Sequence, residues 1–365
     1  MRTKIEELES KTFFEEVSSE IPPGDIVAYN ELRSCADLYR MYTQGILKIQ
    51  PEFQREIVWK GPDQSRFIDS LIKQLPIPSL CFSYDPEKQE WMVIDGLQRI
   101  STIVKFLSGG DWKISKLDDI DQKIAGKSVA AIKVSDSKLY KYYSRVENLS
   151  IPVTVLRCDH SKKSHLEYLF TIFHRLNTGG MKLNNQEIRN CIYGGPFNRL
   201  LKELDLTTSW RKINKMRSNN SYRFTKQELI LRFFAFHYSL DKYDGNLAKF
   251  LNSFMYENRY INEDSTFHLT KLFQNTSDLI FEKLFDKKSP KKNVSITIIE
   301  SLMVGVCANI VVLQNQPPQT IKQKFKKMLN DPNFSDDSLK EGLSRKQKLV
   351  DRLNAAIEIF SAKTS

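Results

Sequence analysis

The stretch "WMVIDGLQRISTIVKFLSGG", residues 91–110, reads as a strand, a tight turn and a helix in quick succession. Its first four residues are a short apolar run suited to a buried strand, the next two turn the chain, and apolar residues then recur at helical spacing. Three polar side chains, Asp95, Gln98 and Arg99, stand where the helix begins. Either they cap and brace the turn, or they hold an anion against the start of the helix.

The composition is ordinary for a soluble globular protein. The chain has 365 residues, 41% apolar and 27% charged, enough for one large domain or two ordinary ones. It lacks an apolar run of about eighteen residues and begins with a charged segment, so we expect neither a membrane span nor a secretory signal. The five cysteines lie far apart with no CxxC pair. This spacing indicates a cytoplasmic protein and argues against disulfides or a thiolate zinc site.

Positive charge is concentrated in the second half of the chain. Residues 1–200 hold 28 Lys and Arg against 26 Asp and Glu, whereas residues 201–365 hold 27 against 18. Clustered positive charge is typical of nucleic-acid binding, although solvated helix faces produce the same pattern. From the basic residues of this second half we select eight DNA-binding candidates: Arg211, Lys212, Lys215, Arg217, Lys322, Lys324, Lys326 and Lys327.

The secondary structure that the sequence predicts changes near residue 200. Before it, the patterns predict strands at residues 46–50, 79–85, 90–95 and 151–158, and helices at residues 1–20, 29–42, 63–75 and 163–176. Beyond it, strand signals nearly vanish and helical periodicity dominates. We therefore predict an α+β protein in which a helical extension (1–25) and a mixed α/β domain (26–205) precede a basic, all-helical domain (206–365).

The turn at Asp95 has the features of a phosphate site. A helix start offers free N–H groups and a positive dipole end, and Gly96 permits close approach of a ligand. Arg99 can grip phosphate oxygens, and Ser101 and Thr102 can donate further bonds. Asp95 can hold a divalent metal or orient a water. The alternative is an Asp N-cap beside a surface Arg.

Two further stretches carry polar residues in an apolar or helix-ending context. In "PEFQREIVW", residues 51–59, Gln54 and Arg55 are a polar pair held in an apolar frame, with ion pairing of Arg55 to a neighbouring glutamate as the alternative. In "FHRLNTGGMKLNNQEIRN", residues 173–190, the spacing of Asn184 and Glu187 predicts a capping box.

That capping box does not account for Arg175, Asn177 or Arg189, which can converge on one polar site. The proximity of His174 to Arg175 and Asn177 leaves a His-centred nuclease open. The sequence contains no P-loop, GxSxG, HExxH or kinase signature.

Together, "PEFQREIVW", "IDGLQRISTI" and "FHRLNTGGMKLNNQEIRN" resemble the N-terminal domain family of GmrSD-type modification-dependent restriction endonucleases, over residues 26–205. That family carries QR-x-x-x-W, DGQQR and N-T-G-G-x-x-L-x-x-x-E-x-R elements in this order. The resemblance implies a ParB/sulfiredoxin-like core, nucleoside triphosphate bound with Mg²⁺ or another divalent ion, and a role in phage defence. It assigns Asp95, Gln98 and Arg99 as catalytic, with Asp95 at the metal. The nucleotide-binding residues that it implies are Gln54, Arg55, Gly96, Arg99, Asn177, Thr178, Gly179, Glu187 and Arg189. From their own position in the sequence we add Ser101, Thr102 and Arg175 to these candidates.

The sequence departs from the family in two places. Leu97 replaces the first glutamine of DGQQR, which puts hydrolysis in doubt, and we find no HNH nuclease domain after residue 205. The leading hypothesis is an NTP-hydrolysing component of a phage-defence or restriction system whose basic helical domain contacts DNA, with a partner nuclease or defence protein. The alternatives are a DNA-binding protein without turnover, gated by nucleotide or independent of it, and a metal-dependent nuclease using Asp95. The oligomeric state stays open.

Overall fold

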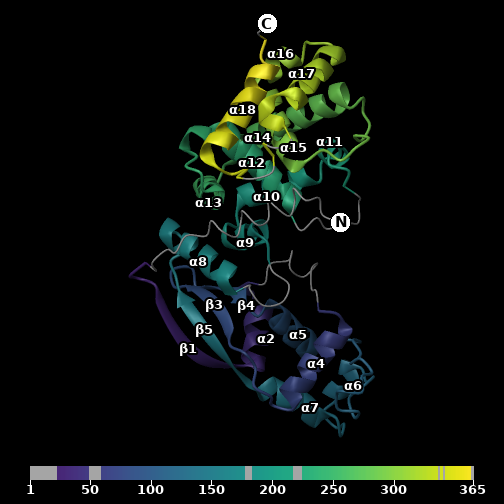
Figure 1. Cartoon of the computed structure of the whole chain (residues 1–365). Coiled ribbons are helices and arrows are strands. Elements are labelled where there is room, and N and C mark those ends of the chain that lie inside the picture. The colour runs from purple at the N-terminus through teal and green to yellow at the C-terminus, as the bar shows by residue number, and fades with distance from the viewer. Residues whose placement is uncertain are drawn as a thin grey trace. The chain divides into compact units, whose positions relative to one another are not determined.

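The computed structural model describes residues 23–48, 59–176, 183–216, 224–335, 338–339 and 342–362. Its contacts separate residues 20–182 from residues 183–365 as two compact units. We call them the α/β unit and the helical unit (Figure 1). The mixed α+β class predicted from the sequence is confirmed.

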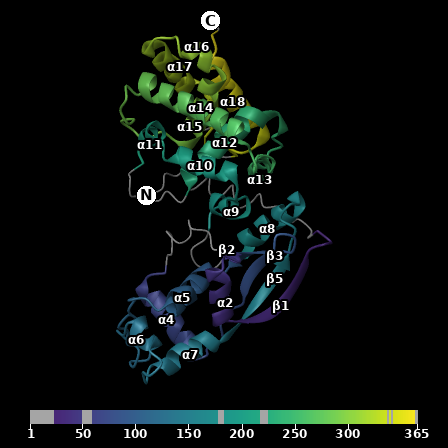
Figure 2. The same ribbon diagram turned by 180° about the vertical axis from the view of Figure 1, so that it is seen from behind.

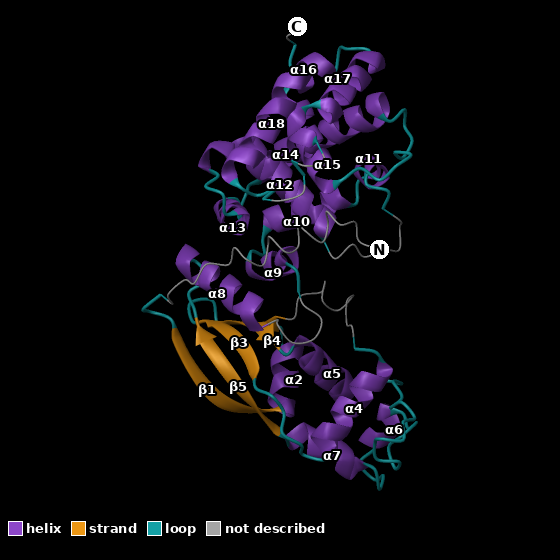
Figure 3. Ribbon diagram, in the orientation of Figure 1, coloured by secondary structure: helices purple, strands orange, loops and turns teal. Residues whose placement is uncertain are grey.

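The α/β unit contains five strands and the helices that pack on them (Figure 3). The strands are β1 (Val27–Ser34), β2 (Leu47–Lys48), β3 (Leu80–Asp85), β4 (Glu90–Asp95) and β5 (Ser150–Arg157). The helices are α2 (Cys35–Thr43), α4 (Gly61–Ile72), α5 (Leu97–Ser108), α6 (Val129–Lys133), α7 (Tyr140–Asn148) and α8 (Lys163–Leu176).

The five strands form one mixed sheet in the order β1-β5-β3-β4-β2. Strands β3 and β4 are an antiparallel pair in which Tyr84 lies opposite Trp91, whereas β3 runs parallel to β5 and β4 runs parallel to β2. The strands predicted at residues 79–85 and 90–95 are therefore confirmed. At the end of β4, Asp95 pairs with Cys81 of the central strand β3, whereas β2 pairs with β4 only at Trp91 and Met92.

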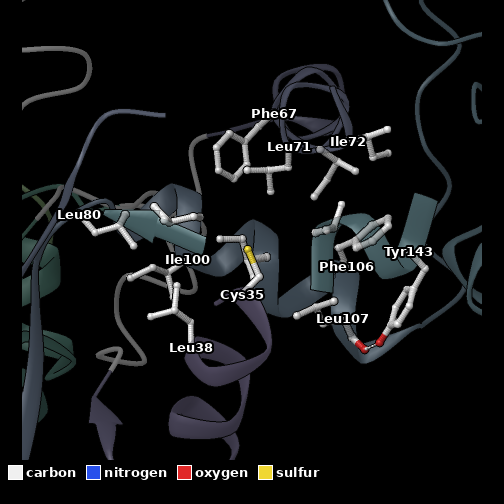
Figure 4. Packing of buried hydrophobic residues seen from close by; sticks show 14 of the residues in the cluster. Cys35, Leu38, Phe67, Leu71, Ile72, Leu80, Ile100, Phe106, Leu107 and Tyr143 are labelled. Atoms are coloured by element: carbon white, nitrogen blue, oxygen red, sulfur yellow. Dashed lines mark hydrogen bonds between the residues drawn. The ribbon is translucent and has the colours of Figure 1, made fainter. Parts of the chain in front are cut away.

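The core of the α/β unit lies between one face of the sheet and helices α2, α4, α5 and α7 (Figure 4). Leu80 from β3, Ile100 from α5 and Leu71 from α4 are all fully buried there. Because alternate strand residues face opposite sides, Cys81 and Ile94 point away from this cluster, toward the face on which α8 packs against β4. Helix α5, which begins at the Asp95 turn, is thus held by apolar packing along its length.

The helix predicted at residues 29–42 is wrong in its first part. Residues up to Ser34 belong to β1, which pairs antiparallel with β5 from Val27 to Ser34. Helix α2 begins only at Cys35, where the Ser34 hydroxyl caps it by accepting from the Asp37 N–H at 3.1 Å. Local periodicity predicted one helix because it carries no information about the distant strand that pairs with this segment.

The helical unit consists of helices and short helical turns (Figure 2). They are α9 (Asn185–Ile192), α10 (Pro196–Asp205), α11 (Thr208–Ile213), α12 (Thr225–Ser239), η1 (Leu240–Lys242), α13 (Leu247–Glu257), α14 (Glu263–Leu279), η2 (Ile280–Leu284), α15 (Ile296–Ala308), α16 (Ile310–Leu313), α17 (Pro318–Asn330), η3 (Pro332–Phe334) and α18 (Lys346–Phe360). Helices α9 and α10 pack with α12 in this unit, although the sequence-based division placed them in the first domain.

An aromatic core supports the helical unit. Phe233 and Phe234 on α12 lie against Phe273 on α14, with ring centroids 5.7 and 6.2 Å apart, and Trp210 on α11 meets Phe273 edge-on at 5.4 Å. Across the described residues, none of the helices is both long and apolar enough to cross a membrane. The helix predicted at residues 1–20 lies outside the described residues.

Candidate functional site

The turn between β4 and α5 depends on a glycine. Gly96 is the N-cap of α5 and has φ of 94° and ψ of 16°, in the left-handed region that side-chain-bearing residues rarely adopt. A Cβ built on Gly96 would lie 2.2 Å from Cδ2 of the buried Leu80. The N-cap is thus Gly96 and not Asp95, which ends β4, so the alternative of an Asp N-cap is wrong.

The start of α5 presents backbone donors. The first helical bond runs from the Ile100 N–H to the Gly96 carbonyl at 2.9 Å. The N–H groups of Leu97, Gln98 and Arg99 precede it and have no carbonyl partner within the helix, so they carry the positive end of the helix dipole. No side chain caps them among the described residues. This is the arrangement that binds phosphate oxygens in other proteins.

Arg99 folds back over the turn instead of extending into solvent. Its Nη2 donates to Asp95 Oδ2 at 2.8 Å and to the Ser79 carbonyl at 3.3 Å, and Nη1 donates to the Pro78 carbonyl. The Arg99 side chain is 13% exposed, and burial lowers its pKa, although an Arg stays charged. Arg99 thereby ties the end of β4 to the segment that leads into β3. The Asp95 carboxylate, 38% exposed, is held beside the helix start.

The residues that flank Arg99 point in different directions. The Gln98 side-chain oxygen accepts from the Trp59 backbone N–H at 3.4 Å, so Gln98 anchors the chain where it enters α4. Leu97 packs against the apolar core. The Thr102 hydroxyl is fully buried and donates to the Gln98 carbonyl at 2.7 Å, and Ser101 is 9% exposed. Of these side chains, Gln98 lies at the turn itself, whereas the two hydroxyl residues face inward along α5.

The other predicted nucleotide-binding residues have separate surroundings. Arg175 is exposed near the end of α8. Glu187 closes the predicted capping box of α9 with Asn184, whose Oδ1 accepts from the Glu187 N–H at 2.9 Å, so that prediction is confirmed. Residues Gln54, Arg55, Asn177, Thr178, Gly179 and Arg217 lie outside the described residues.

Arg189 is fully buried in the helical unit. It donates to Asn252 Oδ1 at 2.9 Å and forms an ion pair with Glu228 at 3.0 Å. Burial lowers the pKa of Arg189; burial alone would raise the pKa of Glu228, but the charges of Arg232 and Arg189 hold it below its usual range. Nucleotide contact by Arg189 stays a prediction, and it would require this side chain to leave its partners.

The Arg189–Glu228 pair opens a ladder of ion pairs that crosses the helical unit. Arg232 on α12 bridges Glu228, at 2.7 Å, and Glu300 on α15, at 3.2 Å. Arg352 on α18 lies 3.4 Å from Glu300. Four helices, α9, α12, α15 and α18, are therefore joined through alternating charges. Each buried charge has an opposite charge beside it, which is the condition under which such groups are tolerated away from water.

Carboxylates that favour a metal are sparse around the turn. Across the described part of the chain, no group of three or more His, Cys, Asp and Glu side chains gathers as a metal cage. Asp95 instead offers one carboxylate, with Oδ2 paired to Arg99. A magnesium ion that travels with nucleotide phosphates is commonly held by one or two carboxylates, so this residue set fits a nucleotide-borne ion better than a resident one.

A family model described as the N-terminal domain of GmrSD restriction endonuclease matches residues 35–194. We call residues 35–194 the GmrSD domain after this match. The match contains the Asp95 turn, and it also contains α9 with Arg189, which packs in the helical unit. No curated protein and no solved structure matches the chain. The GmrSD domain implies a component of a restriction or phage-defence system.

Outside the GmrSD domain, the predicted DNA-binding lysines divide into two kinds. Lys322 binds both oxygens of Asp286 at 2.7 Å, and Lys324 donates to the Ile359 and Ser361 carbonyls at the end of α18. These two lysines hold the fold together. Three others, Lys212, Lys326 and Lys327, are exposed.

Arg211 and Lys215 lie around α11, and Lys215 donates to the Lys291 carbonyl at 2.9 Å. This bond connects the segment after α11 to the lysine-rich turn of residues 286–292. Two stretches that are distant in the sequence therefore meet in the helical unit.

Sequence reasoning missed the partners that fix the turn of the GmrSD domain. The carbonyls of Pro78 and Ser79 carry no side-chain signal, so no sequence pattern reveals that they receive Arg99. The charged ladder did leave a signal. Glu300 is the one charged residue in the mostly apolar helix Ile296–Ala308. A lone acid within such a helix indicates a buried partner of opposite charge.

Proposed function

We propose that the protein binds a nucleoside triphosphate with a divalent cation at the DGLQR turn of its GmrSD domain and hydrolyses it. We further propose that the helical unit contacts DNA, as part of a restriction or phage-defence system. One observation carries the nucleotide proposal: the free N–H groups at the start of α5 lie beside an acid that is held in place by Arg99. The N–H groups bind the phosphate anion, and the neighbouring carboxylate binds the metal ion that accompanies it.

The backbone supplies the phosphate contacts. The N–H groups of Leu97, Gln98 and Arg99 point out of the first turn of α5, and Gly96 has no side chain to keep an oxygen away. The core packing of α5 fixes the direction of these donors before any ligand arrives. Donors that are fixed in advance bind charge without the cost of rearrangement.

Asp95 supplies the metal contact. With Oδ2 engaged by Arg99, the other oxygen of the carboxylate is the one directed to a cation or a water. Hydrolysis transfers the terminal phosphoryl group to water, so that the bond from the bridging oxygen to the terminal phosphorus breaks and the diphosphate leaves. Asp95 and Gln98 would orient that water or the ion.

Arg99 has a different role from the one the sequence suggested. Its guanidinium donates to a carboxylate and two carbonyls, so we propose that it positions Asp95 and the turn. Direct contact of Arg99 with nucleotide stays a prediction. The Leu97 side chain packs on the core and not over the N–H donors. We therefore expect Leu97 in place of glutamine to leave phosphate binding intact.

The test mixes the protein with each of the four NTPs and Mg²⁺, and follows nucleotide-induced thermal stabilisation together with phosphate release. A ligand at about 100 times its Kd stabilises the folded state by about 2.7 kcal/mol, which a melting curve detects. Asp95→Asn keeps the shape of the side chain and should lower phosphate release and raise the Mg²⁺ concentration needed. Asp119→Asn, an exposed acid of the same unit, is the matched control.

The outcomes separate the functions. Stabilisation by NTP together with release that depends on Asp95 supports the proposed hydrolysis. Stabilisation without release would make the turn a nucleotide-gated switch. DNA cleavage that depends on Asp95 in the absence of nucleotide would make it a nuclease. No response to any NTP would refute nucleotide binding and leave Asp95 and Arg99 as a structural brace.

A further inference from the structure

The helical unit contains a π-helical turn next to two strained residues. Helix α14 continues at Leu279 into η2, a π-helical turn over Ile280–Leu284. Shortly after it, Asp286 and Lys287 have φ of 51° and 59°. Consecutive non-glycine residues in this left-handed region carry a conformational cost, and both π-turns and such residues are concentrated at functional sites. The feature therefore calls for a functional explanation.

Three basic stretches that are distant in the sequence meet at this turn. Lys322 on α17 binds Asp286, and Phe325 on α17 meets Phe285 edge-on with centroids 6.3 Å apart. On the other side, α11 packs against η2, and Lys215 binds the Lys291 carbonyl. Basic residues of the segments 210–216, 286–292 and 321–327, which are distant in the sequence, are thus joined around η2.

Exposed lysines outnumber exposed acids around η2. The lysines with exposed side chains are Lys212, Lys288, Lys291, Lys292, Lys326 and Lys327. Nearby acids are already engaged: Asp286 by Lys322, Glu282 by Lys287 at 3.5 Å, and Asp278 by the Ser209 hydroxyl at 2.5 Å. We call this set of six lysines the η2 surface.

We infer that the η2 surface is where the helical unit binds the phosphate backbone of duplex DNA. The inference deepens the proposed function, on which it rests for the choice of DNA as the partner. Lysines are point charges on flexible stems, which suits contact with successive phosphates without reading bases. The N–H groups of Lys287 and Lys288 donate to the Phe281 and Phe285 carbonyls and fix the strained turn on η2, and the Lys322–Asp286 pair fixes α17 against it.

The lysines of the η2 surface differ in part from the DNA-binding candidates selected from the sequence. Lys322 and Lys324 position the surface through intramolecular bonds, whereas Lys288, Lys291 and Lys292, which were not among those candidates, contact DNA directly. Lys326 follows Lys322 by one helical turn on the same face of α17, so it extends the surface along that helix.

The experiment measures binding of a short labelled DNA duplex by fluorescence anisotropy between about 50 and 200 mM salt. The variant Lys288→Gln, Lys291→Gln, Lys292→Gln is compared with a control of equal charge change, Lys242→Gln, Lys249→Gln, Lys346→Gln. The control lysines are exposed. Lys346 lies at the first turn of α18. Lys324 binds the other end of this helix, about 20 Å from Lys346 along the helix axis. Melting curves of both variants confirm folding.

Loss of phosphate contacts reduces the slope of log affinity against log salt by about 0.9 for each contact. We expect the η2 variant to lower this slope by up to about 3 and to bind more weakly at every salt concentration, while the control keeps the wild-type slope. Equal slopes in the two variants would overturn the inference. So would a wild-type protein that binds RNA but no DNA, or neither.

NTP stabilisation, measured on the same preparations, reports on the proposed nucleotide site independently. A wild-type protein that is stabilised by NTP but binds no DNA overturns the η2 surface and leaves the nucleotide site standing. DNA binding that depends on the η2 lysines in a protein without any NTP response supports the surface while refuting the nucleotide site.

Discussion

Replacement of Gly96 by alanine tests the packing of the turn that carries the candidate site. The new Cβ would lie 2.2 Å from Cδ2 of Leu80, and φ would stay at 94°, where an alanine is strained. Leu80 is fully buried in the core, so a shift of its side chain disturbs the packing of its neighbours. Gly109, at the other end of α5, provides a matched control. It has φ of 75°, and its new Cβ would meet the flexible Lys133 side chain.

The two substitutions share one energetic term and differ in the other. A left-handed backbone at a non-glycine residue costs about 1–2 kcal/mol, and the loss of glycine's freedom in the unfolded chain offsets about 0.4–1 kcal/mol of this. Gly109→Ala should therefore destabilise by about 1 kcal/mol. Gly96→Ala adds the overpacking against Leu80, which costs about 1–3 kcal/mol in well-packed cores.

Urea unfolding measures the difference. With a slope of about 2 kcal/mol per molar urea, Gly96→Ala should unfold at a midpoint about 0.5–1.5 M below that of Gly109→Ala. If the turn binds nucleotide, Gly96→Ala should also lose the NTP-induced rise in melting temperature, because the β4–α5 turn moves, whereas Gly109→Ala should keep it. Equal midpoints for the two variants would refute the close packing of Gly96 on Leu80.

The remaining predictions address the charges and thiols. Glu300→Gln leaves Arg232 and Arg352 without the acid that they share, and urea unfolding should show a loss of stability of about 3–5 kcal/mol. The control Glu358→Gln, at an exposed position, should cost about 0.5 kcal/mol or less. Similar values for the two variants would mean that the ladder contributes no more to stability than a surface charge does. All five cysteines are buried, and burial raises the pKa of several of these thiols to about 12. A thiol reagent at pH 8 should therefore modify them only after the protein is unfolded in urea. Stoichiometric reaction of the folded protein in buffer would contradict this packing. Hydrogen bonds from Lys162 and His165 lower the pKa of Asp25 to about 2, so the stability it contributes is present above about pH 4 and is lost as the pH falls toward 2. Asp25→Asn should reduce the pH dependence of the melting temperature in that window, and an unchanged profile would show that these bonds do not form in solution.

The fold could be predicted where the pattern is local. The strand pair at β3 and β4, the helices α4 and α8 and the helical second half all follow from short-range periodicity. The error at residues 29–34 arose because β1 is defined by its pairing with β5, more than one hundred residues away. The strand order likewise depends on pairings between distant segments, which no local pattern encodes.

The candidate site divides in the same way. Asp95, Gly96, Gln98 and Arg99 stand together in the sequence, and their motif suffices to place a polar turn at the start of a helix. The interaction of Arg99 with the Pro78 and Ser79 carbonyls could not be predicted, since main-chain acceptors have no residue type. Nor could the burial of Arg189 against Glu228, which arises only when α9 packs against α12.

By itself the sequence determined the class of the fold, the polar turn at the start of α5 and the basic excess of the second half, because residue type and short spacing specify each of these. Only the tertiary structure decided which charges are available to a ligand. It binds Lys322, Lys324 and Arg189 inside the protein, holds Arg99 against the backbone, and joins three separate lysine clusters around η2. The physical reason is that a long charged side chain reaches whichever acid or carbonyl the packing brings near, and that partner is set by the whole fold.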